Sequence, residues 1–154
     1  PPAAVSSDPE AFELRRTWSS GDTVTLDMPM VWRFVKGHRL QEGKAALMRG
    51  PLVFCLGAAQ NADALKKYPG FGGVVVDPAC VGEPEADASV RPNGRKVKVG
   101  VWVEAPGAWS KGAPRETLTF TEFVDPTGLA TYVHLLDLGQ AVEDELVSDC
   151  FAGK

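Results

Sequence analysis

The stretch RKVKVGVWVEA, residues 95–105, decides the fold class. The valines at positions 97, 99, 101 and 103 would share one face of an extended chain, and Lys96, Lys98, Trp102 and Glu104 would share the other. Strict alternation of apolar and polar side chains is typical of a β-strand with one buried face. We therefore expect this segment to be a strand whose valines lie in the core.

Turn-forming residues divide the rest of the chain into short segments. The 154 residues include 16 Gly and 12 Pro, a content that favours many short strands over long helices. Apolar alternation in residues 12–28, interrupted by the turn-like 19–22, predicts one hairpin. Residues 118–123 and 130–136, on either side of VDPTGL, predict a second.

Two further segments complete the expected architecture. PLVFCLG, residues 51–57, is apolar on both faces, which indicates a strand buried between two layers. NADALKKY, residues 61–68, predicts one short helix capped by Asn61. With about eight or nine short strands in all, we predict an all-β fold: an antiparallel two-sheet β-sandwich, jelly-roll-like, with at most one or two short helices.

The domain organisation follows from where the alternation begins and ends. Residues 1–10 are rich in Pro, Ala and Ser and are predicted to be a flexible lead-in. Residues 11–138 are predicted to form the β-sandwich domain. Residues 139–154 form a C-terminal tail with apolar residues at helical offsets, so it is predicted either as a short helix or as a partly disordered segment.

Charge and cysteine content exclude several classes of partner. The net charge of −4 comes from intermixed acids and bases without a basic run, so we expect no nucleic-acid partner. The apolar runs are far shorter than the roughly 20 residues that cross a bilayer, so we expect no membrane span. The three cysteines have no metal-ligand spacing, and we expect no metal or cofactor. A disulfide between Cys80 and Cys150 stays open, as does the choice among cytoplasm, periplasm and secretion.

Few residues are candidates for chemistry. Catalysis of glycoside hydrolysis needs two opposed carboxylates, and most acids here lie in turns or on solvent-facing strand positions. One pair, His134 with Glu122, could serve as acid and base, but His134 alternates with Tyr132 as a packed or interface histidine would. We therefore favour structural roles for both.

Aromatic residues offer a binding surface instead. Trp102 falls on the polar side of its strand, and Trp109 and Tyr68 fall in or beside loops. Exposed rings on a β-domain can stack on sugars or can pack against another domain. We prefer the interdomain role and keep carbohydrate binding as the alternative.

Two sequence phrases resemble a known family. The pattern R-x-W-x-x-G-D-x-V-x-L-x-M-P-M, residues 16–30, precedes G-K-x-A-L-x-R-G-P-L-V-F-C, residues 43–55. Together they resemble the C-terminal β-sandwich region of the β-L-arabinofuranosidase-like glycoside hydrolases of family 127, once classed as a domain of unknown function. The resemblance covers residues 12–56, and residues 118–135 resemble a closing hairpin of related bacterial proteins.

The resemblance implies a division of labour. In that family a helical (α/α)₆ barrel carries the chemistry, with a cysteine nucleophile at a zinc site. Cys55 belongs to the sheet phrase and matches no part of that site, so no catalytic residue carries over. The resemblance therefore implies that this chain, which also lacks an initiator Met, is a fragment: a noncatalytic accessory domain that packs against a barrel outside the chain, with Arg49 able to meet an acid of that barrel. Whether the chain has any activity of its own stays uncertain.

Overall fold

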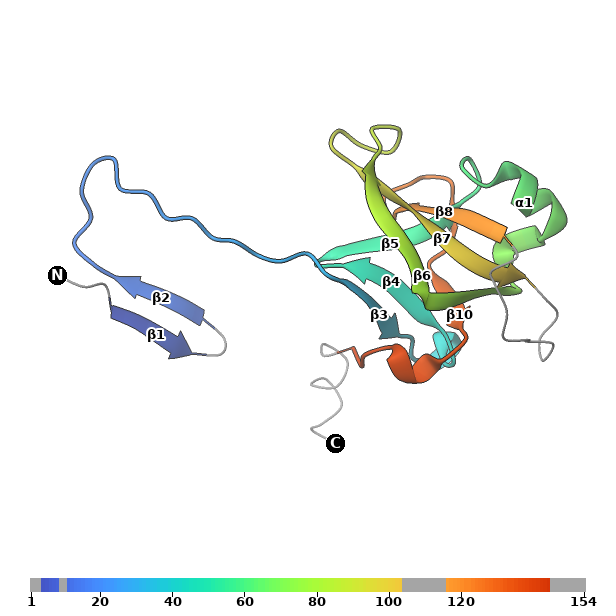
Figure 1. Cartoon of the computed structure of the whole chain (residues 1–154), viewed down its shortest axis with the longest axis horizontal. Coiled ribbons are helices and arrows are strands. Elements are labelled where there is room, and N and C mark those ends of the chain that lie inside the picture. The colour runs from blue at the N-terminus through green and yellow to red at the C-terminus, as the bar shows by residue number, and fades with distance from the viewer. Residues whose placement is uncertain (1–3, 9–10, 104–115, 145–154) are drawn as a thin grey trace.

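The computed structural model describes residues 4–8, 11–103 and 116–144, with the backbone alone before residue 14 (Figure 1). An N-terminal pair of antiparallel strands, β1 (Ala4–Asp8) and β2 (Ala11–Arg15), leads into an extended arm, residues 16–31. The arm runs from this pair to the main domain (Figure 1). All other described strands belong to a single sheet.

The main sheet has eight strands. Their spatial order is β3 (Trp32–Lys36), β4 (Ala45–Arg49), β10 (Tyr132–Leu135), β6 (Val74–Ala86), β7 (Arg95–Val103), β8 (Glu116–Glu122), β5 (Leu52–Gly57) and β9 (Gly128–Ala130). All neighbours are antiparallel except β10 and β6, which run parallel. Strand β4 also pairs with β5, so the six strands from β4 to β5 close into a barrel with β3 and β9 as additions.

The predicted two-sheet β-sandwich is therefore wrong. Only Gly50 and Pro51 separate β4 from β5, and Gly50 has a φ of 54°, the left-handed conformation that a tight reversal uses. The two strands therefore remain paired, with Met48 opposite Val53 and Arg49 opposite Leu52. This pairing joins the two edges that a sandwich would leave apart. Register shifts in β6 near Val81 bend that strand as it follows the barrel wall.

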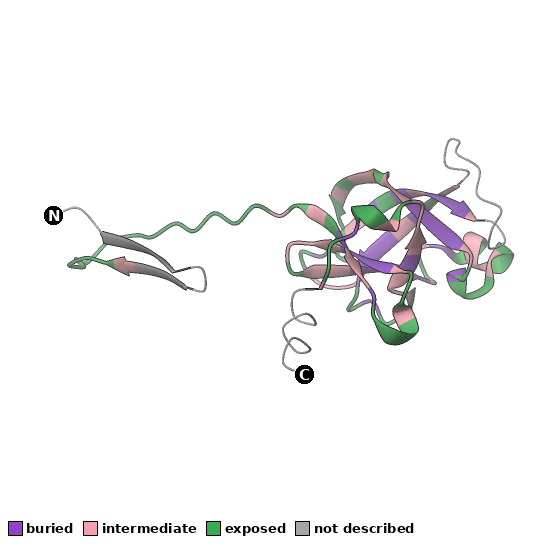
Figure 2. Ribbon diagram, turned by 90° about the horizontal axis from the view of Figure 1, so that it is seen from below, coloured by how far each residue is buried: buried purple, intermediate pink, exposed green. Residues whose placement is uncertain are grey.

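The core confirms the alternation that opened the analysis. Val97, Val99 and Val101 are fully buried, and they meet Phe120 and Leu118 of β8 inside the barrel. Buried residues concentrate on the strands, while the arm is exposed along most of its length (Figure 2). The period-two pattern holds from Lys96 to Val101, where outward side chains are more exposed than the valines, and it fails at Trp102, which is buried.

The outer face of β5 explains its apolar pattern. Phe54 and Leu56 point into the core, whereas Cys55 lies outside that cluster and is nevertheless 1% exposed. The connection after β8 covers this outer face, because Gly128 lies so close to Cys55 that a Cβ there would be 2.9 Å from its sulfur. A barrel strand that is covered by a turn thus has the same sequence pattern as a strand between two sheets.

The helices of the described residues are short. Helix α1 (Ala62–Lys67) confirms the predicted helix, and three 3₁₀ turns accompany it: η1 (Arg39–Gln41), η2 (Pro69–Phe71) and η3 (Leu138–Gln140). No helix in this part of the chain has the length and apolar character to cross a membrane.

Asn61 occupies the N-cap of α1 without capping it. Its side chain donates to the carbonyls of Gly57 and Thr119 and accepts from Thr119 N at 2.8 Å, which ties the helix to β5 and β8.

Both predicted hairpins are wrong in their pairing. Strand β2 pairs with β1 rather than with residues 23–28, which have no strand partner among the described residues. The expected turn does form, because Asp22 N donates to Ser19 O at 3.1 Å. In the second case, β10 pairs with β4 and β6 rather than with β8. Strand pairing depends on partners distant in sequence, which local alternation does not identify.

A core substitution tests the closed barrel. We expect Phe120→Ala to lower the free energy of unfolding by about 3–5 kcal/mol, because the ring is fully buried and its loss leaves a cavity. Leu40→Ala is the control: Leu40 is 94% exposed, so we expect a change below about 0.5 kcal/mol. Urea unfolding followed by tryptophan fluorescence gives both values, and equal losses in the two variants would contradict the core.

Candidate functional site

A cleft of about 560 Å³ lies along β9, β10 and the connection between them. Its volume is within the range of about 300–1,000 Å³ that small-molecule sites occupy. Five parts of the chain contribute, and the lining residues are Gln41, Lys44, Val53, Gly70, Phe71, Gly72, Val74, Phe123, Leu129, Ala130, Thr131, Tyr132, Val133 and His134. None of them is Asp or Glu.

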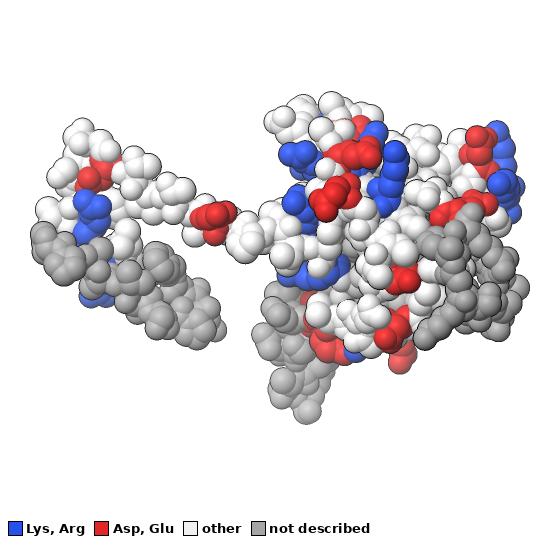
Figure 3. Space-filling view, viewed as in Figure 1, with Lys and Arg blue, Asp and Glu red and all other residues white. Residues whose placement is uncertain are grey.

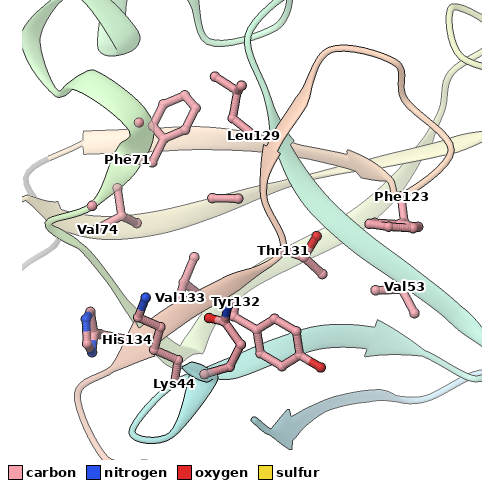
Figure 4. Close-up of a pocket in the computed structure, with 14 residues that line it drawn as sticks. Lys44, Val53, Phe71, Val74, Phe123, Leu129, Thr131, Tyr132, Val133 and His134 are labelled. Carbon is pink, nitrogen blue, oxygen red and sulfur yellow. The ribbon is translucent and has the colours of Figure 1, made fainter. Parts of the chain in front are cut away.

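Strand β10 forms the centre of the cleft. Tyr132 and His134 are two residues apart and therefore project from the same side of the strand, while Val133 between them is 2% exposed and belongs to the core. In Figure 4, Tyr132, His134 and Lys44 gather at one end of the cleft, and Phe123 and Val53 lie at the other. The cleft thus has a polar end and an apolar end.

The β3–β4 connection, residues 37–44, holds the polar end in place. Gly37 N donates to Lys44 O at 2.8 Å, and Lys44 N donates to Gln41 O at 3.1 Å. Gly37 is needed here because a Cβ at this position would lie 2.6 Å from Cβ of Gln41 and 3.0 Å from Cδ1 of Tyr132. The close approach of this connection to the Tyr132 ring fixes Gln41 and Lys44 beside it.

A buried carboxylate holds the apolar end. Asp125 is 6% exposed, and its carboxylate accepts hydrogen bonds from Thr127 N at 2.8 Å, Thr127 Oγ1 at 2.7 Å and Thr121 Oγ1 at 2.8 Å. Phe123 N also donates to Val53 O at 2.9 Å. These bonds fix the turn between β8 and β9, so Phe123 is presented on a rigid support although its ring is 62% exposed.

Hydrogen bonding decides the ionisation of this carboxylate. Burial by itself would raise the pKa of Asp125, but the bonds from Thr127 and Thr121 together outweigh it and hold the pKa below its usual value. The group is therefore a structural anion in the folded protein. Burial raises the pKa of the neighbouring Cys55 thiol, which disfavours a reactive thiolate there.

Glu122 has a structural role as well. It is 3% exposed, and it accepts hydrogen bonds from Arg91 Nε, from Arg91 Nη2 at 2.9 Å and from Arg95 N at 2.9 Å. His134 lines the cleft, but Glu122 is not among the lining residues. The structure does not bring these two residues together in the cleft as an acid and base.

The predicted site residues are dispersed. Trp102 is only 3% exposed, so the expectation that its ring faces solvent is wrong: although it lies opposite the core valines of β7, this part of the barrel exterior is covered. Trp109 lies outside the described residues. Tyr68 follows α1, and its hydroxyl donates to Glu116 Oε1 at 2.9 Å. Arg49 lies with its guanidinium 5.7 Å from the centroid of the Trp32 ring. Trp102, Tyr68 and Arg49 are not among the residues that line the cleft.

Several lining residues were missed by sequence reasoning. The alternation of Tyr132 and His134 was visible, but it was interpreted as packing. Gln41 and Lys44 stand in a polar connection about 90 residues earlier, and no local signal joins them to β10. Phe123, at the end of a predicted strand, carried a weak signal as an aromatic beside a turn.

Residues 4–8, 11–103 and 116–144 contain no group of three or more His, Cys, Asp and Glu residues placed to hold a metal ion. Cys55 and Cys80 are free cysteines, and Cys150 lies outside the described residues.

Charged residues of both signs are interspersed over the visible face of the domain (Figure 3). Many of them form ion pairs, including Lys96 with Asp87 and Lys98 with Glu85. Surface pairs of this kind contribute little to stability. The cleft differs from this mixed surface because, among the described residues that line it, Lys44 is the one lysine or arginine and none is acidic.

Substitution of the buried carboxylate tests the turn. We expect Asp125→Asn to lower the free energy of unfolding at pH 7 by about 1–3 kcal/mol, because the charge-assisted hydrogen bonds are weakened. Since the folded pKa is depressed, the stabilisation is present above the usual carboxyl pKa of about 3.9 and is lost as the pH falls toward the folded value. The difference between the two proteins should therefore narrow at about pH 3.

Urea midpoints at both pH values measure this effect. Asp63→Asn is the matched control, because Asp63 is exposed and pairs only with Lys66 on the surface of α1. A difference that stays constant with pH would contradict the depressed pKa of Asp125.

Comparison with known proteins places the chain by fold. No protein-family model and no curated protein matches it. A solved structure of a glycoside hydrolase superposes with a TM-score of 0.65 at 16% identity, over 88% of this chain and 24% of that one. A GH127 β-L-arabinofuranosidase from Geobacillus stearothermophilus T6 superposes with a TM-score of 0.50 at 18% identity, over 70% of this chain and 18% of that one.

At these identities the likeness concerns the fold. The chain spans about a quarter or less of the length of each structure that it matches. The resemblance seen in residues 16–30 and 43–55 is thus confirmed at the level of fold, with a barrel in place of the expected sandwich. This chain has the fold of one part of a longer glycoside-hydrolase chain.

Proposed function

We propose that the chain is a noncatalytic accessory domain of a glycoside-hydrolase-like protein, which packs against a helical catalytic barrel that the chain does not contain. The observation that carries this proposal is the arm, residues 16–31, with its exposed apolar side chains. The fold likeness supports it, because in both matched structures this fold is a minor part of a much longer chain.

The arm has the alternating sequence of a strand but no partner strand among the described residues. Its alternating side chains at Trp18, Val24, Leu26 and Met28 are 51%, 54%, 71% and 68% exposed, respectively. Burial of one such side chain contributes roughly 1.5–3 kcal/mol, so a series of them left in water has a strong tendency to find a protein surface. Alternation indicates that a sheet or a flat apolar face is the complement.

The base of the arm is anchored to the domain. Gly50 N donates to Val31 O at 3.2 Å, and Met30 lies over Gly50, where a Cβ would be 2.3 Å from its sulfur. The two phrases that carry the family resemblance therefore meet at the β4–β5 turn. Docking of the arm would therefore fix the position of this chain's β-barrel relative to the helical catalytic barrel.

The N-terminal strand pair also favours docking against another protein surface. Strands β1 and β2 pair only with each other among the described strands, and an isolated two-stranded sheet is marginally stable in water. Additional protein surface alongside this pair would stabilise it. The turn at the head of the arm is itself well formed, since Asp22 accepts from Ser19 N at 2.7 Å and from Arg16 Nη2 at 2.9 Å.

The noncatalytic part of the proposal rests on the carboxylates. Glycosidases of the usual kind need two carboxyl groups that face a common substrate. Glu122 and Asp125 are the most buried acids of the described chain, and both are engaged by arginine or threonine donors. A carboxylate whose oxygens accept these hydrogen bonds stabilises the fold and is not available as a catalytic acid or base.

The first experiment measures turnover. We expect the isolated chain to leave aryl α- and β-L-arabinofuranosides intact, because its two buried carboxylates serve the turn and the Arg91 pair. Release of the aryl group is followed by absorbance. Turnover that disappears in Glu122→Gln, His134→Gln or Asp125→Asn would contradict the noncatalytic role.

The second experiment measures docking. The catalytic part of the parent protein is supplied separately, and its binding to this chain is measured by calorimetry. We expect the triple variant Val24→Ser, Leu26→Ser, Met28→Ser to weaken binding by at least about tenfold, because tenfold corresponds to about 1.4 kcal/mol and each lost side chain contributes that much.

The opposite face of the same arm provides the control. Thr23→Ser with Thr25→Ser changes side chains of the same segment without altering its apolar face. Equal affinities for the triple variant and the native chain would contradict docking through the arm.

A further inference from the structure

We infer that the cleft along β10 binds a sugar unit that bears a carboxylate, with the ring against Tyr132 and the carboxylate at Lys44. This ligand site goes beyond the docking role, because it uses only residues of this chain and none of the arm. Its evidence is the lining chemistry, the lone cation and the rigidity of the two ends.

The polar side chains of the cleft have no partners in the described chain. Gln41, Lys44, Thr131, Tyr132 and His134 all line the cleft, and none of their side chains forms a hydrogen bond or ion pair within residues 4–8, 11–103 and 116–144. Amide, hydroxyl and imidazole groups in this number match the hydroxyl groups of a sugar, which both donate and accept. Ligand sites typically combine a cleft with a few polar side chains that are free to bind the ligand, and this cleft has both.

The apolar groups suit the other surface of a sugar. A sugar ring has a face of C–H bonds, and aromatic side chains offer a flat apolar surface with, for tyrosine, a polar tip. Tyr132 is half-buried at the polar end, and Phe123 stands 62% exposed at the other. Leu129, drawn near Phe71 in Figure 4, also lines the cleft and is 54% exposed. The cleft therefore has room for a stacked ring between hydrogen-bonding and apolar walls.

Lys44 selects for an acidic sugar. Every other lysine of the described chain is in an ion pair: Lys36 with Glu143, Lys66 with Asp63, Lys67 with Glu116, Lys96 with Asp87 and Lys98 with Glu85. Lys44 has no such partner in that part of the chain, and none of the described residues that line the cleft is acidic. A ligand carboxylate would complete the pair that the protein leaves open.

Both ends of the cleft are set before a ligand arrives. Backbone bonds between Gly37, Gln41 and Lys44 fix the polar end, and the Asp125 turn fixes Phe123. The backbone at both ends then loses little conformational freedom on binding, which favours affinity. The same rigidity makes the effects of single substitutions interpretable.

The experiment compares two disaccharides that differ in charge. The isolated chain is titrated with a disaccharide of galacturonic acid and with the corresponding uncharged disaccharide of galactose, by calorimetry and by amide chemical shifts. We expect the acidic disaccharide to bind at least about fivefold more tightly at low salt, with the preference shrinking as salt screens the charge. Shifts should centre on residues 41–44 and 129–134.

Single substitutions separate stacking from charge. We expect Lys44→Gln to abolish the preference for the acidic sugar and Tyr132→Ala to weaken both sugars about tenfold, through loss of the ring surface. Tyr132→Phe keeps the ring and should retain the preference, so the test holds even if Tyr132→Ala unfolds. Phe123→Ala alters an exposed ring and provides a second test of the apolar wall. Lys66→Gln, which removes an exposed lysine on α1, is the matched control and should change nothing.

The outcomes divide clearly. Binding of neither disaccharide, equal binding of both, or a preference that survives Lys44→Gln would overturn the acidic-sugar site. Shifts confined to residues outside the cleft would do the same. Because the assay needs no catalytic partner, its failure would leave the docking of the arm intact, and failed docking would leave this site intact.

Discussion

The short reversal between β4 and β5 is the constraint on which the rest of the fold depends. Two residues, Gly50 and Pro51, turn the chain, and the left-handed backbone of Gly50 keeps the two strands paired. The pairing joins the edges of the sheet and makes it a barrel. The same turn contacts Met30 and accepts the base of the arm through the bond from Gly50 N to Val31 O. One turn therefore both closes the barrel and fixes where the arm leaves it.

A second constraint is the Asp125 carboxylate. It takes three hydrogen bonds from two threonines, and so directs the chain from β8 back over the outer face of β5. From there the chain enters β10, which lies between β4 and β6. The exposed apolar surface of Phe123 is tolerated because the backbone beneath it is held. The buried anion and the cleft wall are thus parts of one structure.

The sequence predicted what local pattern encodes and failed where distant pairing decides. The valines of residues 97–101 and the helix at residues 62–67 were predicted correctly, since their signals are local. The hairpin at residues 118–136 was wrong because β10 finds its partners more than 50 residues away. The sandwich was wrong because a covered barrel strand and a two-layer strand share one pattern. The cleft is assembled from five separate segments, and no local signal joins them to one another.

The arm and the cleft expose different kinds of side chain. The arm exposes apolar side chains at strand spacing, which only a large protein surface can bury. Among the described residues, the cleft exposes polar groups without hydrogen-bond partners and one lysine without an ion-pair partner, which a small polar ligand can engage. No arm residue lines the cleft, so the two can be filled together. If the chain docks through the arm as proposed, the cleft stays open, and the same domain could bind a charged sugar while it is docked.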